Sequence, residues 1–290
     1  MEQFLANGLC KGAVYGIISI GFFVICKTTG VFHIAHAAIC ASAAYAAYIC
    51  LIKLHLGLPL SLLVAAISAG MLGIVVDVVV YKPLQKRKAS PLILLISSLG
   101  TNVVLTNCLV LFFGSQPISL YPGPQPTTNL WGVILTQTQV RQVELFLLLA
   151  VGYLLIMRFG SLGRLCTALA DNPMLASVLG MDVARIRAYL FLLGSSLAGV
   201  GSALFALDVG AEPSSGMPLM FSSVAACIIG GLRHHESPIV GALLLGLAQG
   251  LVTWRFASNW EGAITFFLVI LIFLFRDQGV LSVTRRAEEV

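Results

Sequence analysis

The sequence predicts an all-α integral membrane protein: one polytopic bundle of about eight to ten transmembrane helices, formed by residues 1–290 as a single domain. Hydrophobic residues make up 58% of the chain and charged residues only 10%, whereas a soluble domain carries roughly 25% charged residues. Mean hydropathy is +0.97. Apolar stretches recur along the whole chain, and helices are the simplest way to satisfy their backbone groups in lipid.

The predicted spans follow one another with mostly short connections. The first span lacks a basic start and a small-residue cleavage site, and it runs into more apolar sequence, so we expect it to be retained rather than removed as a signal peptide. The fifth and seventh spans are short, so we expect each of them to tilt, to begin in the headgroup region or to be re-entrant. Because a crossing takes about 20 helical residues, the predicted spans are residues 4–26, 33–52, 60–80, 91–113, 143–159, 187–207, 217–232, 239–255 and 260–276.

The charges of the loops predict how this bundle is oriented in the membrane. The loop Lys82–Lys88 carries four cations and no acid, which places it in the cytoplasm by the positive-inside rule. Counting from it puts the N-terminus outside and the C-terminal Arg285 and Arg286 inside. The Pro-rich loop 115–141 falls outside, where it forms a hairpin or lid that contacts an external partner, or serves only as a connector. Since loop cations explain the net charge of +5, nucleic-acid binding is not predicted.

Small residues recur at helical spacing within several spans. Gly8, Gly12 and Gly16 repeat every fourth residue, and similar stripes lie in the sixth and eighth spans. In lipid, small residues let helices approach closely, so van der Waals contact holds them together. The glycines predicted to mediate this packing are Gly8, Gly12, Gly16, Gly194, Gly199 and Gly246.

Sequence motifs for catalysis and nucleotide binding are absent. No Lys follows a Gly, so the chain lacks a GxxxxGK loop, and it contains no HExxH, GxSxG or CxxC. The carboxylates Asp77, Asp208 and Glu261 fall near the ends of spans, whereas an ion-coupled carrier usually places one at mid-membrane. We therefore expect no catalytic, cofactor or metal site in this chain, and an energy source outside it.

One polar pair is a candidate for the solute pathway. His33 and His36 share a helix face near the start of the second span, where they would meet a permeating solute. The alternative is a structural role, with both imidazoles hydrogen-bonded at a helix terminus. Metal binding is disfavoured because no Cys or carboxylate lies nearby.

A basic segment at 161–187 is the candidate for binding a soluble partner. Asn172 and Pro173 predict a helix start and Gly180 its end. The helix between them is mostly apolar and flanked by arginines, so it either inserts into a groove on a cytoplasmic protein or lies on the membrane lipid. The candidate coupling residues are Asp171, Asn172, Pro173, Met174, Leu175, Leu179 and Gly180.

These elements together resemble the membrane permease subunit of branched-chain amino-acid ABC importers, a family that also includes urea and short-chain amide permeases. The order and spacing of the motifs carry the resemblance over nearly the whole chain. The matching residues are Asn7-Gly8, Gly12, Tyr15 and Gly21; Thr29-Gly30-Val31 and Ala35-His36; Arg164, Ala168, Ala170-Asp171, Ala176, Gly180 and Arg185; Phe191, Leu193-Gly194, Leu197-Ala198-Gly199 and Gly201; Ala225-Ala226, Gly230-Gly231, Pro238, Gly241-Ala242 and Gly246; and Arg276 with Gly279-Val280-Leu281.

The resemblance implies a non-catalytic subunit in the inner (plasma) membrane of a bacterium. Its implied partners are two cytoplasmic ATP-binding subunits that hold ATP and Mg, a second permease subunit that is identical or a sister chain, and an external solute-binding protein. The implied solute is a branched-chain amino acid or a related small amide. A self-sufficient secondary carrier or facilitator that uses His33 and His36 is the alternative.

Three departures from the family pattern fall at positions where members of the family would contact the solute or a partner. His33 replaces an Asn, Ala37-Ala38 replaces a Gly-Glu pair, and Arg233–Glu236 brings bulky polar groups where small ones are usual.

Overall fold

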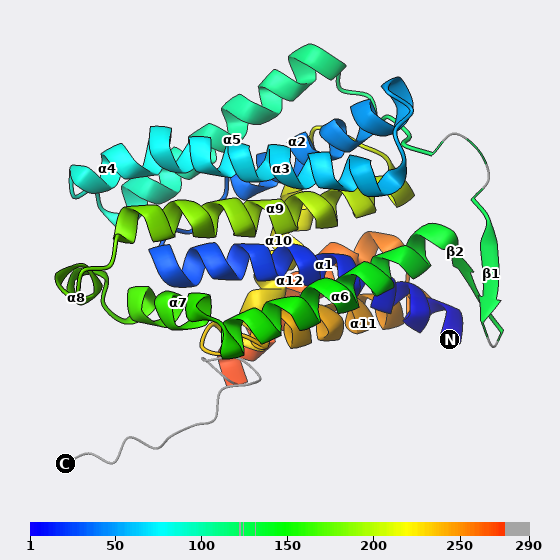
Figure 1. The fold of residues 1–290 in the computed structure, drawn as a ribbon. Coiled ribbons are helices and arrows are strands. Elements are labelled where there is room, and N and C mark those ends of the chain that lie inside the picture. Colours follow the sequence, from blue (N-terminus) through cyan, green and yellow to red (C-terminus); the bar gives the residue numbers. More distant parts are fainter. Residues whose placement is uncertain (122, 124, 131, 276–290) are drawn as a thin grey trace.

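The computed structural model describes residues 1–121, 123, 125–130 and 132–275. The predicted motif residues Arg276 and Gly279-Val280-Leu281, and the C-terminal Arg285 and Arg286, lie outside the described residues. Within them the fold is a bundle of α-helices with one small antiparallel hairpin, which confirms the predicted class (Figure 1).

The helices are α1 (Glu2–Thr29), α2 (His36–Tyr48), α3 (Leu58–Val76), α4 (Lys82–Lys86), α5 (Pro91–Phe113), α6 (Gln137–Phe159), α7 (Ser161–Asp171), α8 (Pro173–Val178), α9 (Val183–Val209), α10 (Gly216–Gly230), α11 (Ser237–Arg255) and α12 (Glu261–Phe275). Two π-helical segments, η1 (Ile49–Lys53) and η2 (Asp77–Tyr81), extend α2 and α3, and η3 (Ser258–Trp260) precedes α12. Strands β1 (Thr127–Leu130) and β2 (Val133–Thr136) form the hairpin.

Among the described residues, seven helical stretches are long and apolar enough to cross a membrane. The shorter apolar helices α10 and α12, each of 15 residues, occupy the seventh and ninth predicted spans. The fifth span was predicted too short, because α6 begins six residues earlier, at Gln137. A reciprocal cap explains this start: Thr136 accepts from the Gln139 backbone N–H, and the Gln139 side chain accepts from the Thr136 N–H.

The two ends of the bundle carry different segments (Figure 1). Helices α4 and α8 lie at one end, and the N-terminus lies at the other, beside the β1–β2 hairpin. Gln3 fixes the hairpin there, since its side chain donates to the Ile134 carbonyl (2.7 Å) and accepts from the Ile134 N–H (2.9 Å). The 161–187 and Lys82–Lys88 segments thus share one end, as the predicted order of crossings requires.

Helix α1 forms the centre of the packing and contacts α6, α9, α10 and α11. Glycines allow these contacts because backbone meets backbone. A Cβ on Gly8 would lie 2.5 Å from the carbonyl oxygen of Gly246, and one on Gly12 would lie 2.9 Å from that of Ala242. On the opposite face, a Cβ on Gly194 of α9 would lie 2.6 Å from the Gly21 oxygen.

The remaining two predicted packing glycines contact side chains. A Cβ on Gly16 would meet the Phe146 ring of α6, and one on Gly199 would lie 2.5 Å from the Ala69 Cβ of α3. No real Cβ tolerates such distances, so these helices would have to separate if the glycines were replaced.

Gly246→Ala should destabilise the bundle by about 1–3 kcal/mol, because its new methyl group would collide with the backbone of Gly8 and Gly12. Thermal unfolding in detergent measures the loss. Gly152→Ala is the matched control, since a Cβ there meets nothing within 4 Å in α6. Equal melting temperatures for the two variants would contradict the close α1–α11 contact.

Candidate functional site

A polar cavity of about 180 Å³ lies among α1, α6, α9 and α11, toward the end that carries the N-terminus. Most of the surrounding bundle surface is apolar, so its polar lining is distinctive. The polar lining residues are Asn7, Lys11, Gln139, Gln142, Asp208 and Thr253. The four helices are far apart in the sequence, so the cavity forms only when they pack against one another.

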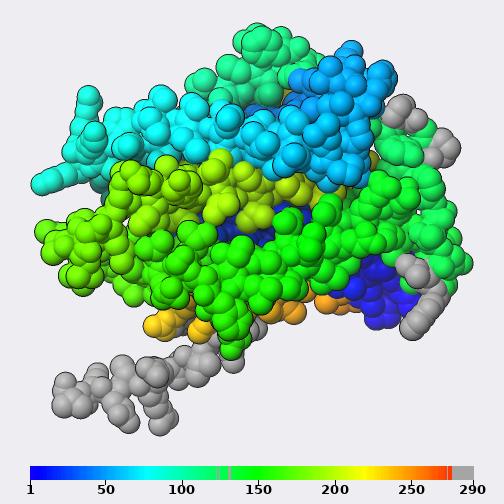
Figure 2. Space-filling view, in the orientation of Figure 1, coloured from blue at the N-terminus to red at the C-terminus, as the bar shows by residue number. Residues whose placement is uncertain are grey.

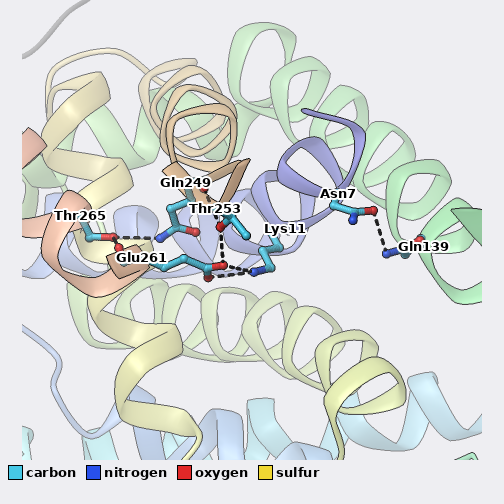
Figure 3. Close-up of polar contacts among 7 residues, drawn as sticks. All are labelled: Asn7, Lys11, Gln139, Gln249, Thr253, Glu261 and Thr265. Carbon is cyan, nitrogen blue, oxygen red and sulfur yellow. Dashed lines mark hydrogen bonds and ion pairs between the residues drawn. The ribbon is translucent and has the colours of Figure 1, made fainter. Parts of the chain in front are cut away.

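An ion pair borders this cavity (Figure 3). The Lys11 Nζ donates to both carboxylate oxygens of Glu261, at 2.6 and 2.8 Å, and the Thr253 hydroxyl donates to the same carboxylate at 3.0 Å. Nearby, the Gln249 amide donates to the Thr265 hydroxyl at 2.9 Å. These bonds fasten α12 to α1 and α11. They also leave Lys11 partly neutralised.

Asp208 adds a carboxylate to the cavity lining. Among the described residues it forms no ion pair within 4.0 Å. The amides opposite it are held by other bonds: Gln142 donates to the Leu204 carbonyl (3.0 Å), and Gln139 donates to Asn7 Oδ1 (3.5 Å; Figure 3). The cavity therefore offers an acidic group, a cation and amides to a small polar molecule.

Sequence reasoning did not select these lining residues. Asn7 entered only as part of a family motif, and Asp208 was noted only as lying near a span end. A usable signal was present, since Lys11 is a cation within the first apolar span and such residues usually face a cavity or a partner.

His33 and His36 lie elsewhere, in the interior of the bundle, and both are fully buried. The His33 Nδ1 lies 2.7 Å from the Tyr81 hydroxyl, which donates to Ser98 Oγ at 2.7 Å. His33, Tyr81 and Ser98 thus form a continuous chain of hydrogen bonds that joins the start of α2 to η2 and α5. Neither histidine lines the polar cavity, and their role in the pathway stays a prediction.

A buried ion pair joins η2 to the first turns of α9. The Arg187 Nε donates to Asp77 Oδ1 at 2.6 Å, with only 11% and 2% of the two side chains exposed. Arg187 Nη1 also donates to Gln85, and the guanidinium lies over the Phe191 ring, 5.4 Å from its centroid. The Nη2 group is buried and has no hydrogen-bond partner among the described residues.

The segment 161–187 contains two short helices at the same end. Helix α7 buries Gly163, Cys166 and Leu169 against the bundle. Helix α8 begins at the predicted Asn172–Pro173 step, where Asn172 Oδ1 accepts from the Leu175 N–H at 2.9 Å. After α8, Gly180 adopts φ +85°, a left-handed conformation that suits glycine and ends the helix.

Helix α8 presents apolar side chains to solvent rather than to the bundle. Exposed fractions reach 78% for Met174 and 70% for Leu179, and only Ala176 is buried in this helix. Figures 1 and 2 show this segment protruding at one extremity. Asp171 ends α7 immediately before it.

The unusual segment Arg233–Glu236 lies beside the end of α1. The Lys27 Nζ donates to the Arg233 carbonyl at 2.6 Å, and His235 Nδ1 lies 3.3 Å from the Tyr153 hydroxyl. Burial, with a smaller contribution from Lys27, lowers the pKa of His235. The neutral imidazole is therefore favoured, and this departure from the family pattern is accommodated by packing against α1 and α6.

A tightly packed apolar bundle, with a polar cavity toward one end and a protruding apolar helix at the other, defines a multi-pass membrane transport protein. Residues 4–274 match the family model described as the permease component of branched-chain amino acid transport systems. The chain belongs to this family.

Curated relatives agree with that assignment, and a solved structure shares the fold. The chain is 29% identical to the high-affinity branched-chain amino acid transport system permease protein BraD of Pseudomonas aeruginosa, over 97% of this chain and 95% of that one. It is 28% identical to the corresponding LivH of Salmonella typhimurium, over 97% of each chain. A chain of the structure titled "PsaBC from Streptococcus pneumoniae in complex with Fab" shares the fold, with a TM-score of 0.54, 12% identity and coverage of 93% and 91%.

Breaking the Asp77–Arg187 pair should cost about 3–5 kcal/mol, because either single substitution, Asp77→Asn or Arg187→Met, leaves a buried polar group without its partner. The double variant should recover much of this loss. Melting in detergent measures all three. Arg185→Met is the control: its pair with Asp182 is 74% and 55% exposed and should contribute little. Additive losses in the double variant would contradict coupling between Asp77 and Arg187.

Proposed function

We propose that this chain is the membrane-spanning permease subunit of an ATP-driven ABC importer that moves branched-chain amino acids, or related small amides, across the inner membrane of a bacterium. The family match over residues 4–274 carries this proposal. The names of BraD and LivH, relatives that align over nearly the full length, supply the solute class.

In this proposal the chain is non-catalytic, and two cytoplasmic ATPase subunits hold ATP and Mg. Helix α8 supports it, because a capped helix with exposed apolar residues at the tip of a membrane bundle suits insertion into a groove on another protein. The coupling segment 161–187 and the basic loop Lys82–Lys88 then face the cytoplasm.

The opposite end would face outward and receive solute from an external binding protein. The N-terminus and the β1–β2 hairpin lie at this end. The outer loop is fastened across the bundle: Ile118 and Ala211 exchange backbone hydrogen bonds at 2.8 Å, and Gln125 donates to the Leu207 carbonyl at 3.0 Å. A second permease subunit, identical or related, would complete the pathway.

The polar cavity is the candidate contact for solute at this outer end. Its volume of about 180 Å³ is roughly six times the ~30 Å³ that one water occupies in the liquid, so it holds one small molecule. Asp208 suits an ammonium group, while Lys11 and the amides suit a carboxylate or amide. His33 and His36 would act deeper in the bundle.

Leu175→Asp should release the ATPase subunits, because a carboxylate in an apolar contact costs several kcal/mol. Co-purification from detergent measures the retained ATPase. Ile134→Asp is the matched control, since Leu175 and Ile134 are 55% and 56% exposed but lie at opposite ends.

Loss of ATPase in the Leu175→Asp complex alone would support α8 as the docking helix. Full ATPase binding by this variant would remove α8 from the proposal. Uptake of labelled leucine by the chain alone, without ATPase subunits or ATP, would instead establish a self-sufficient carrier.

Asp208→Asn should raise the apparent KM for leucine uptake about tenfold, the amount expected when a hydrogen bond to a charged group is lost. Uptake by reconstituted complexes with their binding protein measures this. Glu212→Gln is the control, because it removes an acid that follows α9 but does not line the cavity. An unchanged KM in Asp208→Asn would exclude the cavity as the solute contact.

A further inference from the structure

We propose that the cavity beside the coupling segment binds the headgroup phosphate of an anionic phospholipid. This cavity has a volume of about 520 Å³ and lies where the end of α1 meets η2, α4, α7 and the start of α9. It is separate from the polar cavity at the other end and goes beyond the transport function. Pro173 of the coupling segment lines it, so an occupant would touch the base of α8.

The charged groups of the lining favour an anion. Lys82, Lys86 and Arg187 all line the cavity, and Asp77 is the one carboxylate among its described lining residues. Asp77 already accepts a hydrogen bond from Arg187 Nε, at 2.6 Å. The lining therefore keeps an excess of two positive charges, which the single carboxylate does not neutralise.

Arg187 also adds the charge of its guanidinium group to the lining of the cavity. Its Nε and Nη1 groups donate to Asp77 and Gln85, whereas Nη2 is buried without a hydrogen-bond partner among the described residues. An unpartnered buried donor is costly, and a guanidinium pairs well with phosphate oxygens. A phosphate in the cavity would lie near the guanidinium group and would leave intact the ion pair that holds η2 to α9.

The first turn of α9 adds a partial positive charge. Val183 and Ala184 line the cavity at the start of this 27-residue helix. The helix dipole favours an anion at such a position. Asp182 caps the helix by accepting from the Arg185 N–H at 3.0 Å, and the Arg185 side chain, 3.4 Å from Asp182, offsets its charge.

The place of the cavity favours a lipid as the source of the phosphate. It lies at the ends of membrane spans, and its volume exceeds that of a lone phosphate ion. In the orientation proposed above, this end faces the cytoplasm, where lysines and arginines next to a span attract anionic headgroups. Inorganic phosphate offers the same chemistry without the membrane anchor, so the two sources can be separated.

The test compares the full chain in nanodiscs of phosphatidylcholine with and without phosphatidylglycerol. Lys82→Gln/Lys86→Gln removes two cations and leaves the Asp77–Arg187 pair intact. Lys53→Gln/Arg141→Gln removes the same charge at the other end, from the end of η1 and the start of α6. Thermal stability and native mass spectrometry report bound phosphatidylglycerol, and a third arm adds inorganic phosphate to phosphatidylcholine discs at constant ionic strength.

We expect phosphatidylglycerol to raise the melting temperature of the wild type and of the Lys53→Gln/Arg141→Gln control. Its affinity should fall about tenfold or more in Lys82→Gln/Lys86→Gln. Stabilisation by inorganic phosphate that needs the same lysines would assign the site to a soluble anion instead. Equal phosphatidylglycerol binding by all three proteins, or no effect of either anion, would overturn the proposal.

Discussion

The close approach of α1 to α11 and α9 is the constraint on which the rest of the structure depends. In lipid there is no hydrophobic drive between helices, so contact area and backbone proximity must hold the bundle together. Gly8 and Gly12 bring α1 against α11, and Gly21 brings it against α9. Because α1 is buried on several faces at once, its position also fixes α6 and α10, and α1 itself lines both cavities.

Some of the polar groups inside this bundle join one helix to another. Asp77 and Arg187 join η2 to α9, while Lys11 and Glu261 join α1 to α12. The more buried pair is the costlier to break, since neither of its charges reaches water. Two of the ion pairs among the described residues thus join different helices, and His33, Tyr81 and Ser98 are joined by hydrogen bonds.

Much of the fold follows from the sequence, because span length and glycine spacing are local properties. The length of the apolar stretches was enough to predict the positions of most spans. Asn172, Pro173 and Gly180 were enough to predict the boundaries of α8. The early start of α6 was missed because a polar first turn does not look like membrane sequence. The polar cavity was missed for a different reason: Lys11 and Glu261 are 250 residues apart, and no local pattern says that α1, α6, α9 and α11 enclose a space.

Helix α9 links the two ends of the molecule physically. Its 27 residues span about 40 Å at 1.5 Å per residue, with Arg187 in an early turn and Asp208 in the last one. A continuous α-helix is stiff along its axis, so a displacement of its first turn moves its last turn as well. Helix α8 packs onto the start of α9, and Asp208 lines the polar cavity. In the proposed function, a force applied at the coupling segment would therefore reach the cavity through one element, α9.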